Sequence, residues 1–248
     1  EKVNVETTDL EEEPVEEIPD YPVNLFFTRE GYFKKITPLS LRMGGEQKLK
    51  EGDAIVRQLE STNAAELLFF SDRAQVYKTR AADFADMKAS VMGEYIPVRV
   101  QMDEGETAAA MAVTSDYSGF MLFVFENGKA AKVELSAYST KTNRRKLLNA
   151  YSDKSPLVAA LQLPEDGDVL LTASSGRMLL FNTGLIAPKA TKSTQGVAAM
   201  TLKKGQRVLS AVVYQEGDLQ NPARFKKKLP ALGALPNGEE GRDAQTSL

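Results

Sequence analysis

Leu25-Phe26-Phe27-Thr28-Arg29-Glu30-Gly31-Tyr32-Phe33-Lys34-Lys35 is the stretch that decides the fold. It predicts an apolar strand, a short polar turn that closes on glycine, and a second strand that ends in two lysines. The same pattern returns at residues 68–78, 122–132 and 170–180; the first two copies end in lysine and the last ends in leucine. The turn positions are separated by 43, 54 and 48 residues. Repetition at such a period indicates a propeller, a solenoid or another array.

A second series of polar turns lies about midway between these hairpins. It contains Gly52, Gly105 and Gly205, with Ser155 at the equivalent place in the third copy, at spacings of 53, 50 and 50 residues. A short segment of β character follows each turn, so each repeat is expected to hold about four antiparallel strands. Such units cannot bury their inner faces alone, whereas packing side by side as blades would bury them.

The predicted fold class is therefore all-β, a propeller-like disc of about four four-stranded antiparallel blades. A solenoid is the alternative, although its repeats are usually shorter and more regular. A fifth, partial blade formed by the termini is a further alternative.

The composition excludes several classes of site. The 248 residues include no cysteine and no histidine, which excludes disulfides, Cys/His zinc sites and Ser-His or Cys-His nucleophile pairs. No apolar run approaches the roughly 18–20 residues of a membrane span. Asp166 and Asp168 lie in a predicted turn, and no phosphate-binding glycine loop is present. The sequence predicts no catalytic residue, no metal site and no cofactor. Because the chain begins at Glu1, we expect it to be part of a longer polypeptide.

Charge divides the chain into three predicted regions. Residues 1–20 hold nine acids and one lysine, a net charge of −8, and predict an acidic flexible linker. Residues 21–216 carry +4 and form the predicted β domain. Residues 217–248 carry +1, are rich in proline and glycine, and predict a disordered tail with a basic cluster at 224–228. A linker that only adds solubility is the simpler interpretation of the first region.

Basic residues recur on the outgoing strand of each hairpin and in the loop that follows it. The candidates for DNA contact are Lys34, Lys35, Arg42, Lys48, Lys50, Lys78, Arg80, Lys129, Lys132, Lys141, Arg144, Arg145, Lys146, Arg177, Lys189 and Lys192. One basic group per blade would form a belt around the disc, suited to following a bent phosphate backbone. Ordinary solvated strand edges, where lysine prevents edge-to-edge pairing, are the alternative.

The repeats resemble the C-terminal domain that bacterial type IIA topoisomerases, namely DNA gyrase and topoisomerase IV, carry on their A subunits. Residues 26–35 look like the first blade of that family, and residues 194–205 look like its last. The resemblance covers nearly all of 21–216. It implies a β-pinwheel, a disc whose blades exchange strands with their neighbours, which bends or wraps duplex DNA around a positive rim.

The resemblance also implies the setting of the domain. Its partners would be double-stranded DNA, the remainder of the A subunit, and the ATPase B subunit, in a cytoplasmic, nucleoid-associated enzyme. The DNA-cleaving tyrosine, Mg²⁺ and ATP would belong to parts of the parent enzyme outside this sequence, so the fragment alone would not be an enzyme.

One motif departs from the gyrase pattern. Gyrase carries a Gln-Arg-Arg-Gly-Gly-Lys-Gly box after its first hairpin, and here the equivalent stretch is Leu41-Arg42-Met43-Gly44-Gly45-Glu46-Gln47. Only Arg42, Gly44 and Gly45 match, and Glu46 replaces a basic residue. The degenerate box favours a topoisomerase IV-like or divergent gyrase-like subunit.

The sequence thus predicts non-sequence-specific binding and bending of duplex DNA in support of ATP-dependent strand passage. A propeller used as a protein-interaction platform is the first alternative, and it would bind without dependence on salt. A propeller hydrolase is the second, and it would need carboxylates or a metal at the central channel.

Overall fold

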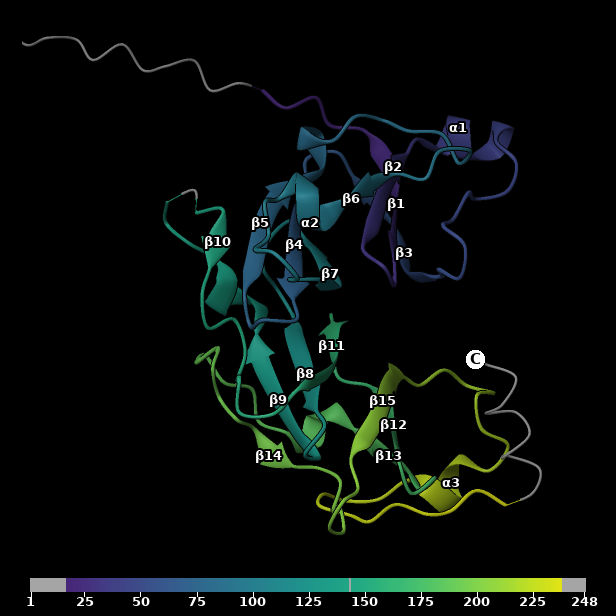
Figure 1. Ribbon diagram of the computed structural model, residues 1–248, viewed down its shortest axis with the longest axis vertical. Coiled ribbons are helices and arrows are strands. Elements are labelled where there is room, and N and C mark those ends of the chain that lie inside the picture. Colours follow the sequence, from purple (N-terminus) through teal and green to yellow (C-terminus); the bar gives the residue numbers. More distant parts are fainter. Residues whose placement is uncertain (1–16, 143, 238–248) are drawn as a thin grey trace, which may run out of the picture.

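Four antiparallel sheets follow one another along the chain in the computed structural model, which describes residues 17–142 and 144–237 (Figure 1). The first sheet contains β1 (Pro22–Thr28), β2 (Tyr32–Ile36), β3 (Ile55–Thr62) and β6 (Glu94–Tyr95). The second contains β4 (Glu66–Ser71), β5 (Val76–Arg80), β7 (Ala108–Thr114) and β10 (Lys146–Leu147). The third contains β8 (Phe120–Phe125), β9 (Lys129–Glu134), β11 (Leu157–Leu163) and β14 (Val197–Ala198). The fourth contains β12 (Asp168–Ala173), β13 (Met178–Asn182) and β15 (Val208–Val213).

The helices are short and lie in the connections. They are α1 (Pro38–Met43), α2 (Ile96–Arg99), α3 (Pro222–Phe225) and three 3₁₀ helices, η1 (Ala81–Asp83), η2 (Leu135–Tyr138) and η3 (Thr183–Leu185). No helix in the described part of the chain has the length and apolar character needed to cross a membrane. The prediction of an all-β fold with four repeated units is confirmed, and three of the four sheets have the expected four strands.

Neighbouring sheets exchange strands. The first three sheets have the order β3-β1-β2-β6, β7-β4-β5-β10 and β11-β8-β9-β14, so a central hairpin lies between an inner strand and an outer strand. The outer strand is contributed by chain that has already passed through the next hairpin: β6 follows β5, β10 follows β9 and β14 follows β13. This exchange is the β-pinwheel arrangement that the resemblance implied.

The hairpin turns explain why glycine recurs in the sequence. The turn position has a positive φ in all four copies, +99° at Gly31, +54° at Ala74, +88° at Gly128 and +84° at Gly176. Glycine adopts this left-handed conformation without steric cost, whereas alanine is strained in it. At Gly128 a side chain is excluded twice, because a Cβ would also lie 2.2 Å from the carbonyl oxygen of Met200.

The two series of turns are neighbours in space although they alternate in sequence. In the first sheet the Arg29 amide donates to the Ala54 carbonyl at 2.8 Å, and in the fourth the Ser174 amide donates to the Arg207 carbonyl at 2.8 Å. Each polar turn therefore closes the same end of its own sheet as the hairpin turn does. This pairing accounts for the equal period of the two sequence signals.

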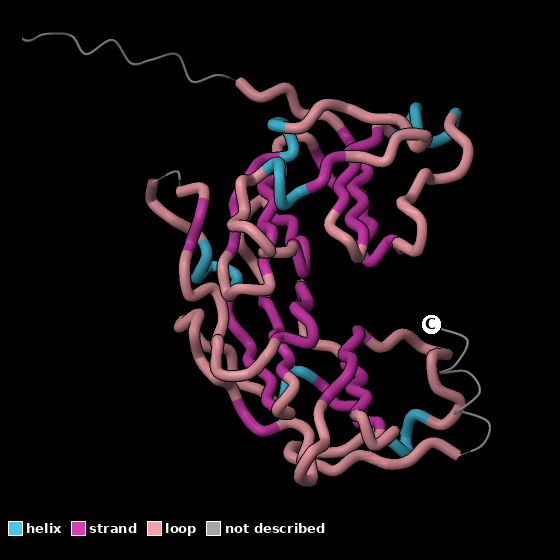
Figure 2. Tube along the Cα trace, viewed as in Figure 1, coloured by secondary structure: helices cyan, strands magenta, loops and turns pink. Residues whose placement is uncertain are grey.

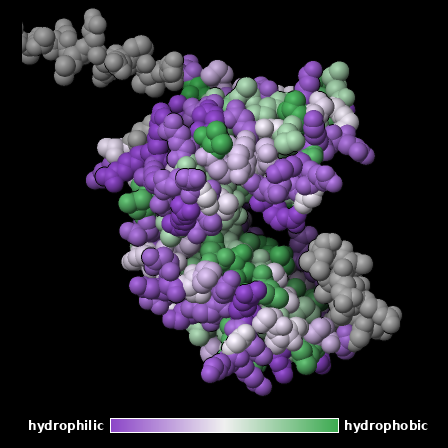
Figure 3. Space-filling view, in the orientation of Figure 1, coloured by the Kyte–Doolittle hydropathy of each residue, from purple (hydrophilic) through white to green (hydrophobic). Residues whose placement is uncertain are grey.

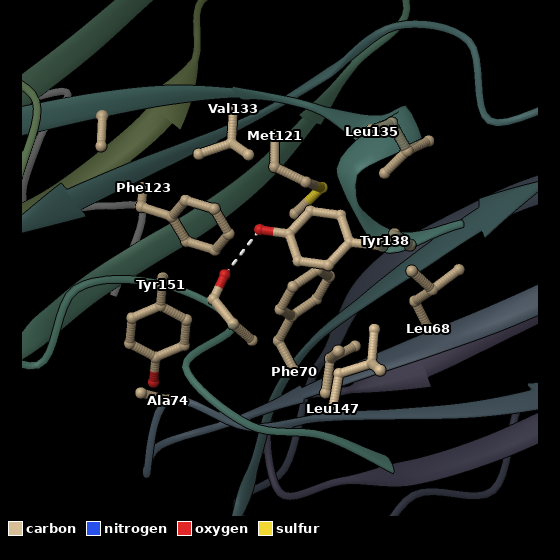
Figure 4. Packing of buried hydrophobic residues seen from close by; sticks show 14 of the residues in the cluster. Leu68, Phe70, Ala74, Met121, Phe123, Val133, Leu135, Tyr138, Leu147 and Tyr151 are labelled. Carbon is tan, nitrogen blue, oxygen red and sulfur yellow. Dashed lines mark hydrogen bonds between the residues drawn. The ribbon is translucent and has the colours of Figure 1, made fainter. Parts of the chain in front are cut away.

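Three buried clusters join the sheets in succession, first to second, second to third and third to fourth. Between the second and third sheets, Phe70 meets the ring of Tyr138 edge-on at 5.2 Å, and the Tyr138 hydroxyl donates to the Ala150 carbonyl at 2.6 Å (Figure 4). Each sheet thus packs on its neighbours, as in other repeat proteins. Figures 1 and 2 show that the four sheets follow an open arc with the first and fourth at its ends.

Leu219 and Phe225 anchor residues 217–237 to the fourth sheet, which differs from the disordered tail predicted over that range. Phe225 is fully buried and Leu219 is 8% exposed, in a cluster with Leu180. The same segment bridges the free edge of β13 at Ala234 and Lys226, where the other sheets have an outer strand. The aromatic anchor and an unpaired sheet edge explain the order. Residues 1–16 of the predicted linker and 238–248 of the predicted tail lie outside the described residues.

Candidate nucleic-acid interface

The two sides of the arc differ in which strands they present. The inner strands β7, β11 and β15 are neighbours on the concave side, and β10 and β14 lie on the convex side (Figure 1). Gln162 of β11 links the inner strands, because its amide oxygen accepts from the Val113 amide at 2.9 Å and from the Arg57 guanidinium at 2.6 Å. The inner strands are thus joined to one another on the concave side, while the short outer strands lie on the convex side.

Three of the predicted contact residues are buried instead. The side chains of Lys34, Lys35 and Lys132 are 1%, 2% and 3% exposed. The Lys34 ammonium donates to the Gln47 side chain and to the carbonyls of Lys48 and Ala89, and burial lowers the Lys34 pKa. These contacts correct the expectation that all sixteen basic residues line one exposed belt.

In the first three hairpins the last lysine contacts the next sheet. The Lys35 ammonium donates to the Ala81 carbonyl of η1 at 3.0 Å, and the Lys78 ammonium donates to the Tyr138 carbonyl of η2 at 3.0 Å. The Lys132 ammonium donates to the Thr183 carbonyl of η3 at 3.2 Å. No sheet follows the fourth hairpin within the described residues, and this hairpin ends in the buried, apolar Leu180. The lysine that recurs at the hairpin end is thus a link between blades.

The other predicted residues reach the surface to differing degrees. Those that are exposed are Arg42, Lys48, Lys50, Arg80, Lys141, Arg144, Arg145, Lys146 and Lys189. Those that are half-buried are Lys78, Lys129, Arg177 and Lys192.

Some of these charges are already engaged by the protein. Lys50 lies 3.8 Å from Glu30, Arg80 lies 3.4 Å from Asp83, and Lys146 lies 3.9 Å from Asp103. The Arg177 guanidinium donates to the Gly233 carbonyl at 3.0 Å, and the Lys129 ammonium donates to the Gln195 amide oxygen at 3.4 Å. Exposed ion pairs of this kind are weak and can exchange with phosphate.

Basic side chains gather on the second sheet. A groove of about 600 Å³ is lined by five basic side chains, Lys78, Arg80, Arg99, Arg145 and Lys146, and by two acidic ones, Glu66 and Asp83. The pairing of β10 with β5 builds it, because the Lys78 amide donates to the Arg145 carbonyl at 2.8 Å. Arg144 and Arg145 make no ion pair with any described residue.

Sequence reasoning missed one residue of this groove. Arg99 lies in α2, outside the hairpin period, pairs with Glu94 at 2.9 Å and covers the ring of Phe84. Nothing in the local sequence signals that α2 faces β5. The basic cluster of the tail was recognised in the sequence, and its Lys226 pairs with Asp168 at 3.1 Å on the fourth sheet.

The degenerate box lies at the end of α1. Thr37 caps this helix by accepting from the Ser40 amide at 3.2 Å, and Gly44 ends it. The matched residues Arg42, Gly44 and Gly45 are exposed, and so is Glu46.

No three carboxylates in the described part of the chain come together as metal ligands. Figure 3 shows a predominantly hydrophilic surface along the convex side. The arrangement can bind an extended anion through several separate contacts.

Comparisons with known proteins agree with this geometry. A family model described as the DNA gyrase C-terminal domain, a β-propeller, matches residues 65–115 and 167–215. The topoisomerase 4 A subunit of Staphylococcus aureus is 21% identical over 206 residues. That alignment covers 81% of this chain and 26% of the relative, so the chain spans about a quarter of the relative's length.

Solved structures share the fold. The C-terminal domain of a DNA topoisomerase IV superposes with a TM-score of 0.74 at 20% identity, covering 88% of this chain and 73% of that one. The E. coli ParC C-terminal domain gives 0.64 at 15% identity, covering 88% and 94%. A DNA gyrase A C-terminal domain gives 0.56 at 18% identity, covering 86% and 76%. With its strand-exchanged sheets and the two repeats that match the family model, the chain is similar to the C-terminal domains of DNA gyrase and topoisomerase IV A subunits and shares their fold.

Proposed function

We propose that this chain binds duplex DNA without sequence specificity along the convex side of the arc and bends it. It would act as the C-terminal part of the A subunit in a type IIA topoisomerase. The observation that carries the proposal is the basic groove of the second sheet, which Arg145 lines; Arg145 and the adjacent Arg144 are exposed and form no ion pair with a described residue.

The charges continue beyond the groove in the direction that a bent duplex would take. Lys189 and Lys192 lie in the connection that leads to β14 of the third sheet. Burial lowers the Lys78 pKa, and repulsion from the positive charge of Lys192 lowers it further. Basic groups on two successive sheets of a convex surface would neutralise phosphates on one side of the duplex, which favours bending towards the protein.

The proposed parent enzyme supplies the remaining chemistry. The DNA-cleaving tyrosine, Mg²⁺ and ATP would act in the B subunit or in the rest of the A subunit, in the cytoplasm on nucleoid DNA. This domain would present a bent segment to that machinery for strand passage.

We further propose a role closer to topoisomerase IV than to gyrase. The box position next to Gly45 carries the exposed carboxylate of Glu46 where a gyrase-like box has a cation. A carboxylate at this place would repel a phosphate, so a tight wrap that begins on the first sheet is disfavoured.

The experiment is a salt titration of binding to three duplexes of different sequence, followed by relaxation of a DNA circle in the presence of the protein. We expect similar affinities for the three duplexes and a log–log salt slope that grows by about 0.9 for each phosphate neutralised. Bending without wrapping would leave the linking number unchanged. Sequence-dependent affinity, or binding that ignores salt, would contradict the proposal.

A second candidate function is a protein-interaction platform. Leu209, Val212 and Val213 of β15 are 51%, 48% and 44% exposed, and Figure 3 shows hydrophobic surface on the concave side around the third and fourth sheets. Such a platform would bind its partner with little dependence on salt.

A further inference from the structure

Each of the three links between blades uses the lysine at the end of its hairpin, but the partners of the three lysines differ. Lys35 donates to the Asn63 amide oxygen at 2.6 Å and pairs with the Asp86 carboxylate at 3.4 Å. Lys132 pairs with the Asp166 carboxylate at 2.6 Å. In the first and third links the buried ammonium is therefore neutralised by a carboxylate, as a buried charge requires.

The second link lacks a carboxylate partner among the described residues. The Lys78 ammonium donates to the Tyr138 carbonyl and to the Thr140 hydroxyl at 3.1 Å. The ring of Tyr117 lies 5.2 Å from this ammonium, in the turn that precedes the third hairpin. All three partners are uncharged, and no described carboxylate lies within ion-pair distance of Lys78, although Glu66 acts on it from further away.

Lys78 is also the one linking lysine that is half-buried rather than buried, and it lines the basic groove. Its surroundings there are strongly positive, although Glu66 and Asp83 also line the groove. Burial and Lys192 both lower the Lys78 pKa, while Glu66 opposes them. An anion bound in the groove would therefore meet the Lys78 ammonium, whose position is fixed by its hydrogen bond to η2.

We propose that the ammonium group of Lys78 contacts a phosphate oxygen of bound duplex DNA while it holds η2. DNA in the groove then supplies the negative charge that Asp86 and Asp166 supply in the other links, and it stiffens the joint between the second and third sheets. This inference rests on the proposed function and adds to it a coupling between DNA binding and blade geometry.

The first test places a carboxylate in the second link. Thr140→Asp puts a carboxylate where the hydroxyl now accepts from Lys78, and Thr140→Asn is its uncharged match. Ser139→Asp adds the same charge to the neighbouring exposed position. We expect T140D to weaken duplex binding about eightfold and to lower the salt slope by about 0.9, the effect of one phosphate contact near 0.1 M salt. T140N should bind like the parent, and S139D should weaken binding clearly less than T140D.

The second test removes the charge and follows the joint. Lys78→Met should weaken binding by a similar factor, and hydrogen exchange of the amides of 135–142 should slow when duplex is added to the parent protein but not to K78M. If K78M does not fold, the T140D, T140N and S139D set still decides.

The outcomes separate this inference from the proposed function. Equal binding by T140D and S139D, with no slowing of exchange at 135–142 in the parent, would overturn the role of Lys78. In that case a loss of binding in an Arg144→Ala/Arg145→Ala variant would leave the proposed function in place. No salt-dependent binding by the parent protein would overturn both.

Discussion

Lys34-Lys35 in β2 and Arg144-Arg145 just before β10 are both pairs of adjacent basic residues, but the molecule uses them in opposite ways. Lys34 and Lys35 are 1% and 2% exposed and donate to carbonyl and side-chain oxygens of their own chain. Arg144 and Arg145 are exposed and have no ion-pair partner among the described residues. The difference teaches that recurring charge in this repeat serves two purposes, linking blades from within and attracting an anion from outside.

Replacing a linking lysine should have the largest effect. Lys132→Met keeps the apolar stem but leaves the Thr183 and Ile186 carbonyls without their donor and the Asp166 carboxylate with only the Thr183 hydroxyl. Unsatisfied acceptors and an unpaired charge should lower the free energy of unfolding by about 2–4 kcal/mol, measured by urea denaturation. Lys35→Met should behave alike.

The folded fraction of these variants should bind duplex DNA within about twofold of the parent, because neither ammonium reaches solvent. A stable K132M protein with strongly weakened DNA binding would reverse the assignment of Lys132.

Replacing the exposed pair should give the second largest effect, on binding rather than stability. Arg144→Ala/Arg145→Ala should weaken binding to all duplexes at least about tenfold and lower the salt slope by about 2. The free energy of unfolding should change by less than about 0.5 kcal/mol, as for other surface substitutions.

The matched control for this pair removes two charges elsewhere. Lys203 and Lys204 are in the turn before β15 and do not line the groove of the second sheet, so Lys203→Gln/Lys204→Gln should reduce binding much less. Equal losses in the two double variants would mean that total charge, and not the groove, determines affinity.

Much of this arrangement could be predicted from the sequence, and the reason is local. Gly31, Gly128 and Gly176 mark turns whose positive φ glycine adopts freely, so the hairpins and their number were visible. The outer strands β6, β10 and β14 are two residues long each, too short to leave a sequence pattern. Strand exchange therefore came only from the family resemblance.

The site was harder to predict, because burial of a lysine depends on acceptors far along the chain. The carbonyl that receives Lys35 belongs to Ala81, and the one that receives Lys132 belongs to Thr183, 46 and 51 residues away. A backbone carbonyl has no sequence signature. The one available signal was the fourth repeat, which ends in Leu180 where the other three end in lysine.

A smaller change, a gain in DNA affinity, is expected from adding a positive charge to the exposed basic surface. Glu46→Lys restores a cation beside Gly44 and Gly45, at the surface end of α1. It should strengthen duplex binding several-fold, up to about eightfold for one new phosphate contact, and should shift the linking number of a relaxed circle. Glu51→Lys makes the same charge change in the exposed turn before β3. If both variants gain affinity equally and neither shifts the linking number, the box position has no special part in guiding DNA.

The smallest expected effect is on the pH dependence of stability, and it tests the ion pair between the linking residue Lys132 and Asp166. Hydrogen bonds from Lys132 and Thr183 hold the pKa of the Asp166 carboxyl below its ordinary value. The charged pair therefore stabilises the fold fully above the unfolded-state pKa of about 4, and this contribution is lost as pH falls through the lower folded-state pKa. Asp166→Asn should be slightly less stable than the parent at pH 7, and the difference should close as the pH falls from about 5 to 3, measured by urea denaturation at each pH.

In a K132M background the same substitution should cost nothing further, because the pair that it interrupts is already absent. An equal cost with and without Lys132 would place the origin of the Asp166 shift in Thr183 alone, and would leave the third link held by its backbone carbonyls rather than by charge.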